Sequence, residues 1–335
     1  MEVTIVLPVY KMKRIVFKLL DSLLLQSYSK FNVMVIYKRW DRHKEILDKI
    51  ETYKKLSISL VKQDEGFFEE ALNTAYRKVD SEVAINTDDD AHVSKNWIKD
   101  HVELHVKHAN VGMATGIVEE STFPDDRLLP AFAKFVNEQK WRMNKHTILD
   151  RPIDSKFDDY GMYIGKSGML VDTGRKHDMI KTFKQHGVNM SWKRDALNGF
   201  RLPGYTKQGG RNEAAAALEV LNRGFVPVWF SRGRTFHPLQ SSDSRGASIK
   251  LLPRELTAES VLFSYYVDMF SGYKVDLDLL KRRVSMDILV SRLISPQASD
   301  GYRVGYDLTK RAITQRWDPK KVRAELTEAL KKVAR

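Results

Sequence analysis

Short apolar runs alternate with amphipathic segments along the first third of the chain. Four of the runs are rich in β-branched residues, which is typical of buried strands: residues 3–7, 32–37, 57–61 and 82–87. The segments between them carry apolar side chains at helical spacing and predict helices over residues 14–26, 43–54 and 67–79. This alternation predicts a doubly wound α/β domain, with a mostly parallel central sheet covered by helices.

The rest of the chain follows a less regular pattern. The elements expected next are a helix over 94–108 capped by Ser94, a strand over 111–118, a helix over 130–141, a β-hairpin over 160–172 and a strand over 225–230. Residues 241–335 are mainly helical in pattern, most clearly at 259–270 and 323–333.

Three consecutive carboxylates follow the fourth apolar run. Asp88, Asp89 and Asp90 stand where a buried central strand would leave the sheet. Carboxylates packed together at such a place repel one another and are costly to desolvate unless a cation neutralises them. Oxygen ligands suit Mg²⁺ or Mn²⁺. A divalent metal site is therefore one interpretation, and a polar turn before the next helix is the other.

The carboxyl ends of the predicted parallel strands should face one crevice, where ligands bind in folds of this kind. Pro8 and Tyr10 after the first strand, and Lys38 after the second, are expected beside the acidic run. No glycine-rich loop follows the first strand, which argues against a dinucleotide-binding domain and against a P-loop enzyme. Phosphate groups must then be held in another way, and metal-bridged carboxylates are one.

Composition restricts the functional groups that the protein can use and the compartment in which we expect it. The 335 residues are 42% hydrophobic, which suits one large or two modest domains, and none is cysteine. The absence of cysteine excludes disulfides, thiolate metal sites and a cysteine nucleophile. No apolar run approaches the roughly 18 residues that span a bilayer, and no signal-peptide pattern opens the chain. We therefore expect a soluble, cytoplasmic protein, with peripheral contact at the inner face of the membrane as a further option.

The net charge is +13. A basic balance suits an anionic partner such as a nucleotide diphosphate, an acidic membrane surface or a nucleic acid. It is equally typical of a solvated basic surface. Composition alone does not choose among these.

Six signatures along residues 1–240 carry a family resemblance. In chain order they are residues 3–10, Gly66 with 71–73, residues 88–90 with Trp97, residues 187–194, Asn212-Glu213 with 223–225, and His237. In this order and spacing they resemble family 2 glycosyltransferases of the GT-A fold, a Rossmann-like α/β/α sandwich. The resemblance predicts a glycosyltransferase domain at 1–240, with a donor-binding part at 1–115 and an acceptor-binding part at 116–240. Residues 241–335 form a basic helical region outside it.

The resemblance implies transfer of a sugar from a nucleotide-sugar donor to an acceptor hydroxyl, with inversion at the anomeric carbon. A divalent metal, Mn²⁺ or Mg²⁺, held by Asp88, Asp90 and His237 would stabilise the diphosphate leaving group. The donor-binding residues that it implies are Pro8, Tyr10, Lys38, Asp41, Asp88 and Asp89.

Two departures from the family pattern bear on mechanism. The family has a Glu-Asp pair whose second member is the general base, and this chain has Asn212-Glu213 there. Glu213 keeps the carboxylate with one more methylene and is the candidate base. The alternative is an asparagine N-cap followed by an acid that the helix dipole favours. The family also has acids after the second strand that bind the nucleotide base. Here Lys38 begins a basic stretch, which leaves Asp41 as a substitute and Tyr10 as a stacking partner.

The sequence does not identify the acceptor. The residues implied to line its side are Asn189, Met190, Ser191 and Asn212, and a glycan, a lipid-linked molecule or a protein would each fit. The apolar stretch 261–270 and the basic residues 281–283 suit packing within the protein, an oligomer interface or docking on anionic lipid. Of these, packing is the interpretation that we favour.

Two other functions stay open. The altered Asn212-Glu213 pair and the missing base-reading acids fit a GT-A scaffold that binds nucleotide sugar or glycan without turnover. The charge of +13 also permits a glycosyltransferase that acts on nucleic acid. Metal-dependent donor turnover would favour an enzyme, and a steep salt dependence of acceptor binding would favour nucleic acid.

Overall fold

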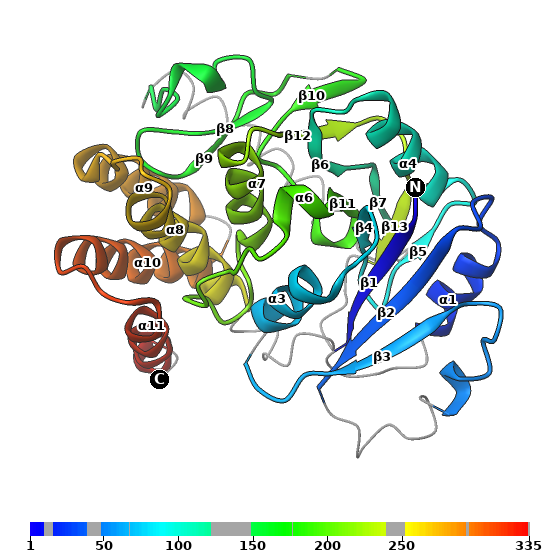
Figure 1. Cartoon of the computed structure of the whole chain (residues 1–335). Coiled ribbons are helices and arrows are strands. Elements are labelled where there is room, and N and C mark those ends of the chain that lie inside the picture. The colour runs from blue at the N-terminus through cyan, green and yellow to red at the C-terminus, as the bar shows by residue number, and fades with distance from the viewer. Residues whose placement is uncertain are drawn as a thin grey trace. The chain divides into compact units, whose positions relative to one another are not determined.

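The fold is described from a computed structural model of the chain, shown in Figure 1. It describes residues 1–9, 16–38, 48–66, 68–121, 149–175, 177–238, 252–292 and 295–333. These residues form two compact units: the first contains 1–121, 177–202 and 216–238, and the second contains 149–175, 203–215 and 252–333. The units interleave along the sequence, whereas the division predicted at residue 240 is linear.

The first unit is built on the alternating elements that the sequence predicts. Its strands are β1 Val3–Val9, β2 Phe31–Tyr37, β3 Ile58–Lys62, β4 Val83–Asn86, β5 His92–Val93, β6 Val111–Thr115, β7 Val118–Ser121, β10 Met179–Lys181, β11 Met190–Lys193, β12 Val226–Phe230 and β13 Thr235–Pro238. Its helices are α1 Val16–Leu24, α3 Phe68–Lys78, α4 Trp97–Lys107, the 3-10 turn Gly187–Asn189 and α6 Arg194–Leu197. Helix α7, Asn212–Asn222, begins in the second unit and continues in the first.

Eight strands form one sheet in the order β10-β12-β6-β11-β4-β1-β2-β3. The neighbours β3, β2, β1 and β4 are parallel, as are β6 and β12. Strand β11 runs antiparallel between β4 and β6, and β10 runs antiparallel beside β12. The sheet is therefore mainly parallel, as predicted. Strand β4, which ends just before the acidic run, lies in its interior.

Helices cover both faces of this sheet. Val3, Ile5 and Leu7 of β1 join one hydrophobic core cluster with side chains of α1 and α4. Figure 1 shows these two helices on one side of the sheet and α3 on the other. On the α3 side, the Tyr76 ring packs edge-on against Trp192 of β11, with ring centroids 5.2 Å apart. Burial on both faces explains why β1, β2 and β4 are largely apolar runs in the sequence, whereas the edge strand β3 is only partly buried.

The carboxyl end of β1 separates from β4. The pairing of these strands ends at Val6 and Asn86, with one more bond from the Thr87 N–H to the Val6 carbonyl at 3.1 Å, whereas β1 continues beside β2 to Val9. Pro8 has no N–H to donate, and it is tolerated because it lies beyond the last β4 pair. The chain after Thr87 can therefore turn away from the sheet at the acidic run.

The second unit combines a hairpin with four helices. Its elements are the 3-10 turn Ser155–Phe157, β8 Met162–Ile164, β9 Leu170–Asp172, α8 Leu252–Phe270, α9 Leu277–Arg292, α10 Pro296–Thr314 and α11 Pro319–Val333. The antiparallel β8–β9 pair confirms the predicted hairpin. Helices α8 and α11 contain the two C-terminal helices that the sequence predicts most clearly.

Helices α8 and α10 approach each other closely because α10 presents two glycines one turn apart. A Cβ at Gly301 would lie 2.3 Å from the Arg254 carbonyl oxygen, and one at Gly305 would lie 2.7 Å from the Ala258 carbonyl oxygen. Residues 261–267 of α8 are all buried. For this apolar stretch, packing within the protein is therefore confirmed over lipid docking.

The basic run 281–283 is not uniformly exposed. Arg283 is buried and donates to Asp150 Oδ2 at 2.6 Å and to the Leu170 carbonyl at 2.6 Å. Asp150 also accepts from the Ser167 hydroxyl at 2.5 Å. This buried network ties α9 to the hairpin. Arg283 is therefore a structural residue, whereas Lys281 and Arg282 remain at the surface.

Three local expectations differ from the structure or lie outside it. The N-cap of α4 is Asn96, because Ser94 continues the β5 strand by donating its N–H to the Arg234 carbonyl at 3.0 Å. The strand expected over 111–118 is two strands, β6 and β7. The helix expected over 130–141 lies outside the described residues.

Within the described residues, no helix combines the length and the apolar character needed to cross a bilayer.

Candidate metal and donor site

The acidic run forms a tight turn at the carboxyl end of β4. The Ala91 N–H donates to the Asp88 carbonyl at 3.2 Å, which closes the turn. Asp89 and Asp90 are buried, and Asp88 is half-buried. The turn therefore holds three carboxylates within four residues, at the edge of the sheet where ligands bind in open α/β folds.

Strand pairing places a histidine beside this turn. The chain leaves the turn through β5, which pairs antiparallel with β13 through His92–Phe236 and Val93–Thr235. The His92 and Phe236 rings stack with centroids 4.8 Å apart. Because antiparallel partners run in opposite directions, the residue after Phe236 faces the residue before His92. The residue after Phe236 is His237, and it stands next to Asp90.

The arrangement suits a divalent cation. One ligand atom each from Asp88, Asp90 and His237 lies within 4.8 Å of the other two. The closest approaches are from His237 Nε2 to Asp90 Oδ1 at 3.2 Å and to Asp88 Oδ2 at 3.7 Å. Two carboxylates and an imidazole form a donor set suited to Mn²⁺. A cation there would also offset the cost of holding two negative charges close together away from water.

The predicted donor residues lie at the same edge of the sheet where the structure describes them. Pro8 is the second-to-last residue of β1, and Lys38 directly follows β2. The Lys38 ammonium donates to the Gly66 carbonyl, so it joins the loop after β3 to the end of β2. Tyr10 and Asp41, the predicted contacts to the nucleotide base, lie outside the described residues.

The three residues expected on the acceptor side lie in the core. Asn189, Met190 and Ser191 have no exposed surface. The Asn189 amide donates to the Ile117 and Gly233 carbonyls at 2.8 and 2.7 Å, and its Oδ1 accepts from Trp97 Nε1 at 2.7 Å. Side chains without exposed surface offer no contact to an acceptor in this conformation. Asn189 supports the site instead, because it holds Gly233, which lies two residues before β13.

Two buried histidines complete this network. His101 Nδ1 and His105 Nε2 lie 2.8 and 2.9 Å from the Ser191 hydroxyl, and His101 Nε2 lies 3.0 Å from Asn189 Oδ1. Burial lowers the pKa of His101 to about 4 and that of His105 to about 3. Both rings are therefore neutral at pH 7. Neither histidine was predicted as a functional residue, although their spacing on one helix face is visible in the sequence.

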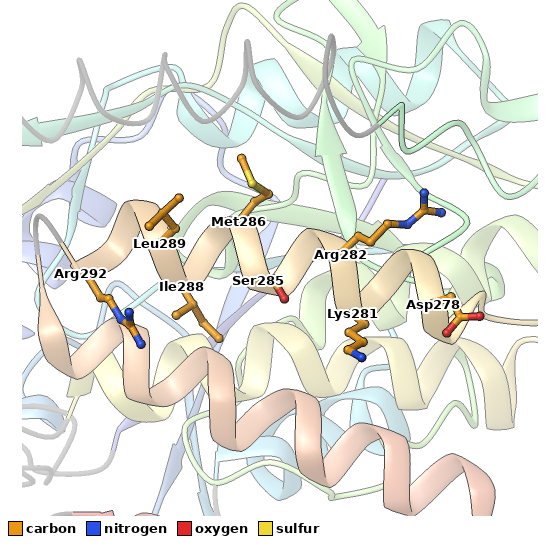
Figure 2. A pocket seen from close by; sticks show the side chains of 8 residues that line it. All are labelled: Asp278, Lys281, Arg282, Ser285, Met286, Ile288, Leu289 and Arg292. Atoms are coloured by element: carbon orange, nitrogen blue, oxygen red, sulfur yellow. The ribbon is translucent and has the colours of Figure 1, made fainter.

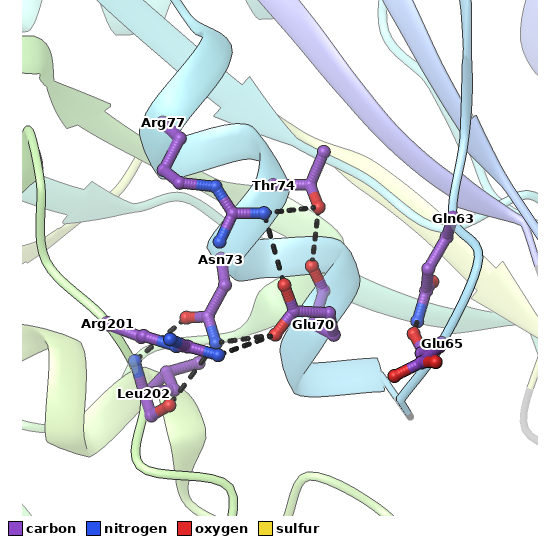
Figure 3. A network of polar contacts seen from close by, with 8 residues as sticks. All are labelled: Gln63, Glu65, Glu70, Asn73, Thr74, Arg77, Arg201 and Leu202. Atoms are coloured by element: carbon purple, nitrogen blue, oxygen red, sulfur yellow. Dashed lines mark hydrogen bonds and ion pairs between the residues drawn. The ribbon is translucent and has the colours of Figure 1, made fainter.

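Figure 3 shows a second polar network, around α3. Asn73 uses both ends of its amide on the backbone of Leu202: Nδ2 donates to the carbonyl at 3.2 Å, and Oδ1 accepts from the N–H at 2.8 Å. Glu70 pairs with Arg77 at 3.1 Å and with Arg201 at 3.7 Å. The family motif residue Asn73 therefore fixes the backbone just before the loop that leads to Asn212-Glu213.

The candidate base lies in the second unit, at the start of α7. Asn212 is buried and is the first residue of the helix, and Glu213 is half-buried in its first turn. Negative charge is favoured near a helix N-terminus. The residue before the pair, Arg211, has φ +70°, a left-handed backbone conformation that is rare without glycine.

Solved structures with a similar fold show the fold class of this chain. A mannosyltransferase from Pyrobaculum calidifontis, PcManGT, in complex with GDP-Man and Mn²⁺, matches with a TM-score of 0.54 and 16% identity over 98% of this chain and 85% of that chain. S. aureus TarS 1–349 in complex with UDP-GlcNAc matches with a TM-score of 0.54 and 13% identity over 98% and 89%. GalNAc-T7 with UDP, GalNAc and Mn²⁺ gives 0.56 and 12% over 94% and 57%. The fold is GT-A, the fold of nucleotide-sugar-dependent glycosyltransferases.

A family model also matches part of the sequence. The model of the family described as Glycosyl transferase family 2 matches residues 4–163. This match confirms the resemblance to family 2 glycosyltransferases that was drawn from the six signatures. No curated protein sequence matches the chain significantly.

Proposed function

We propose that this protein is an inverting glycosyltransferase that moves a sugar from a nucleoside diphosphate donor to an acceptor hydroxyl, with Asp88, Asp90 and His237 holding the divalent metal. The convergence of these three side chains at the carboxyl edge of the sheet carries the proposal. The family and the Mn²⁺ complexes of PcManGT and GalNAc-T7 support it.

The reaction is a single displacement at the anomeric carbon. The acceptor oxygen bonds to that carbon as its bond to the diphosphate oxygen breaks, and the diphosphate leaves with the electron pair. A bound Mn²⁺ or Mg²⁺ would supply positive charge at the leaving diphosphate. Lys38, at the end of β2, adds a cation at the same edge of the sheet. Glu213 takes the proton of the acceptor hydroxyl.

The test is release of nucleoside diphosphate from a panel of UDP- and GDP-sugars, with Mn²⁺, with Mg²⁺ and with chelator. Turnover of one donor that stops on chelation supports the proposal and identifies the nucleotide. A melting shift with nucleotide but no turnover with any donor or acceptor would favour a scaffold that binds without catalysis. Acceptor candidates are glycans, lipid-linked molecules and proteins. A nucleic-acid acceptor would bind with a steep salt dependence.

Glu213→Gln should lower kcat by about 10²- to 10⁴-fold, because general-base catalysis contributes on that order. Donor affinity should not change, since the amide keeps the shape of the side chain. The matched control is Glu219→Gln on the same helix, where the carboxylate pairs with Arg223 at 2.7 Å. Steady-state kinetics and nucleotide melting shifts measure both effects. Full activity in Glu213→Gln would reject the base assignment.

A surface of the second unit suits an anionic membrane, and we include this contact in the proposal. Figure 2 shows a pocket along α9 whose lining includes Lys281, Arg282 and Arg292 as well as Met286, Leu289 and one acid, Asp278. Leu289 is 57% exposed. Cationic side chains around apolar ones are typical of surfaces that lie on anionic lipid headgroups.

Lys281→Gln with Arg282→Gln should weaken binding to phosphatidylglycerol vesicles roughly 30-fold, because each basic residue near such a surface contributes about 1 kcal/mol. Lys331→Gln with Lys332→Gln, at the end of α11, removes the same charge elsewhere in the second unit and should have a small effect. Co-sedimentation with anionic and with neutral vesicles measures this. An equal loss in the two double variants, or equal binding to neutral vesicles, would contradict docking through α9.

A further inference from the structure

A buried carboxylate of α8 holds the loop that leads to the candidate base. Glu259 has no exposed surface. Its Oε1 accepts from the backbone N–H groups of Lys207 and Gln208 at 2.7 and 2.9 Å, and its Oε2 accepts from the Gly210 N–H at 2.7 Å. Three charge-assisted bonds to the backbone fix the loop more firmly than side-chain contacts would.

A second glutamate, one helical turn earlier, holds the side chains of the same loop. Glu255 is nearly buried and accepts from Lys207 Nζ at 2.9 Å and from Gln208 Nε2 at 2.6 Å. The two carboxylates hold different parts of the loop. Among these contacts, Glu259 accepts from backbone N–H groups and Glu255 accepts from side chains. The backbone position of the loop therefore depends mainly on Glu259.

The loop is shaped to receive this carboxylate. A Cβ at Gly210 would lie 2.8 Å from both Glu259 Cβ and Glu259 Oε2, so any side chain there would push the loop away from α8. Arg211 follows in the left-handed conformation, with φ +70°. A strained residue of this kind persists only where its surroundings determine the backbone, and such residues cluster at functional sites. After it, Asn212 and Glu213 open α7.

We infer that Glu259 is a positioning residue for Glu213: it sets the place of the α7 N-terminus, and with it the reach of the Glu213 carboxylate. This inference rests on the proposed role of Glu213 as the base. It gives the C-terminal helices a part in the reaction, although they lie outside the family match at residues 4–163. A base displaced by a fraction of an ångström loses much of its effect, since proton transfer requires hydrogen-bond reach.

The test compares two buried carboxylates of the same helix. Glu259→Gln keeps the shape but turns an NH₂ group toward one of the three N–H donors, so the loop should shift. We expect kcat to fall 10- to 100-fold with little change in the KM for the donor. Asp268→Asn is the matched control, because Asp268 is also nearly buried on α8 and accepts from a backbone N–H, that of Val275 at 3.0 Å. It should lower the melting temperature comparably and leave kcat unchanged.

A double variant separates positioning from general stability. If Glu259 acts through Glu213, then Glu213→Gln with Glu259→Gln should be no slower than Glu213→Gln alone. If the kcat losses of the two single variants multiply in the double variant, or if Glu259→Gln leaves kcat unchanged, the inference is overturned. Full activity of Glu213→Gln would instead reject the base itself. Gly210→Ala displaces the loop from the other side and should reproduce the kcat loss if Glu259→Gln does not fold.

Discussion

Asp90→Ala should lower metal-dependent release of nucleoside diphosphate by about 10²- to 10³-fold, the loss expected when one preorganised group that stabilises a developing charge is removed. Asp90 is the more buried of the two carboxylates that we propose as metal ligands, and it makes the closer approach to His237, at 3.2 Å. Without it, Asp88 in the acidic turn and His237 on β13 offer two ligands, which is too few to hold Mn²⁺ near the diphosphate.

Direct measurement of Mn²⁺ binding, by titration calorimetry without donor, separates this role from an effect on folding. We expect wild-type protein to bind the ion and Asp90→Ala to lose it, with an unchanged circular dichroism spectrum. The control is Asp80→Asn, because Asp80 precedes β4 and so lies at the amino end of that strand, away from the acidic turn. Mn²⁺ bound equally well by Asp90→Ala would show that the metal site has been assigned to the wrong residues.

The parallel core of the first unit could be predicted because its signal is local. Strands β1 to β4 are apolar runs that differ from the predicted ranges by two residues or fewer at each end. A strand buried on both faces needs apolar side chains throughout, so its pattern survives without knowledge of its neighbours. The acidic turn after β4 was predictable for the same reason, since it directly follows such a run.

The strands that the sequence did not predict depend on distant partners. Strand β11 inserts between β4 and β6, yet its segment contains the polar Ser191, whose hydroxyl is used by two histidines. Strand β5 has two residues, too few for any periodicity. Pairing with β13, far along the chain, makes it a strand.

The proposed metal ligands also differ in how much of their signal is local. Asp88 and Asp90 could be proposed from local chemistry, but His237 entered only through the family resemblance. Its place beside Asp90 follows from the β5–β13 register, which no short stretch of sequence encodes. Arg283 also depends on a distant partner: docking on anionic lipid was one interpretation of the run 281–283, and the buried Asp150 that holds Arg283 in the interior is far away in sequence.

Acidification from pH 7 to pH 5 should reduce the free energy of unfolding by on the order of 3 kcal/mol through His101 and His105. Desolvation by burial lowers the pKa of the two rings to about 4 and about 3, whereas histidines of an unfolded chain titrate near 6.5. Between these values the unfolded chain binds protons that the folded chain does not. Stability is therefore fully present above about pH 6.5 and is lost as the pH falls toward 4.

Urea unfolding at pH 7, 6 and 5 measures this loss, and His101→Gln with His105→Gln identifies its source. The double variant should be less stable at pH 7, because it disturbs the contacts with Ser191 and Asn189, but its stability should depend less on pH. His177→Gln, at an exposed position, should keep the wild-type dependence. The slope of the free energy of unfolding against pH identifies the source, because it depends on the number of protons bound on unfolding and not on the absolute stability. A double variant with the wild-type slope would show that other groups, such as paired carboxylates, cause the acid sensitivity.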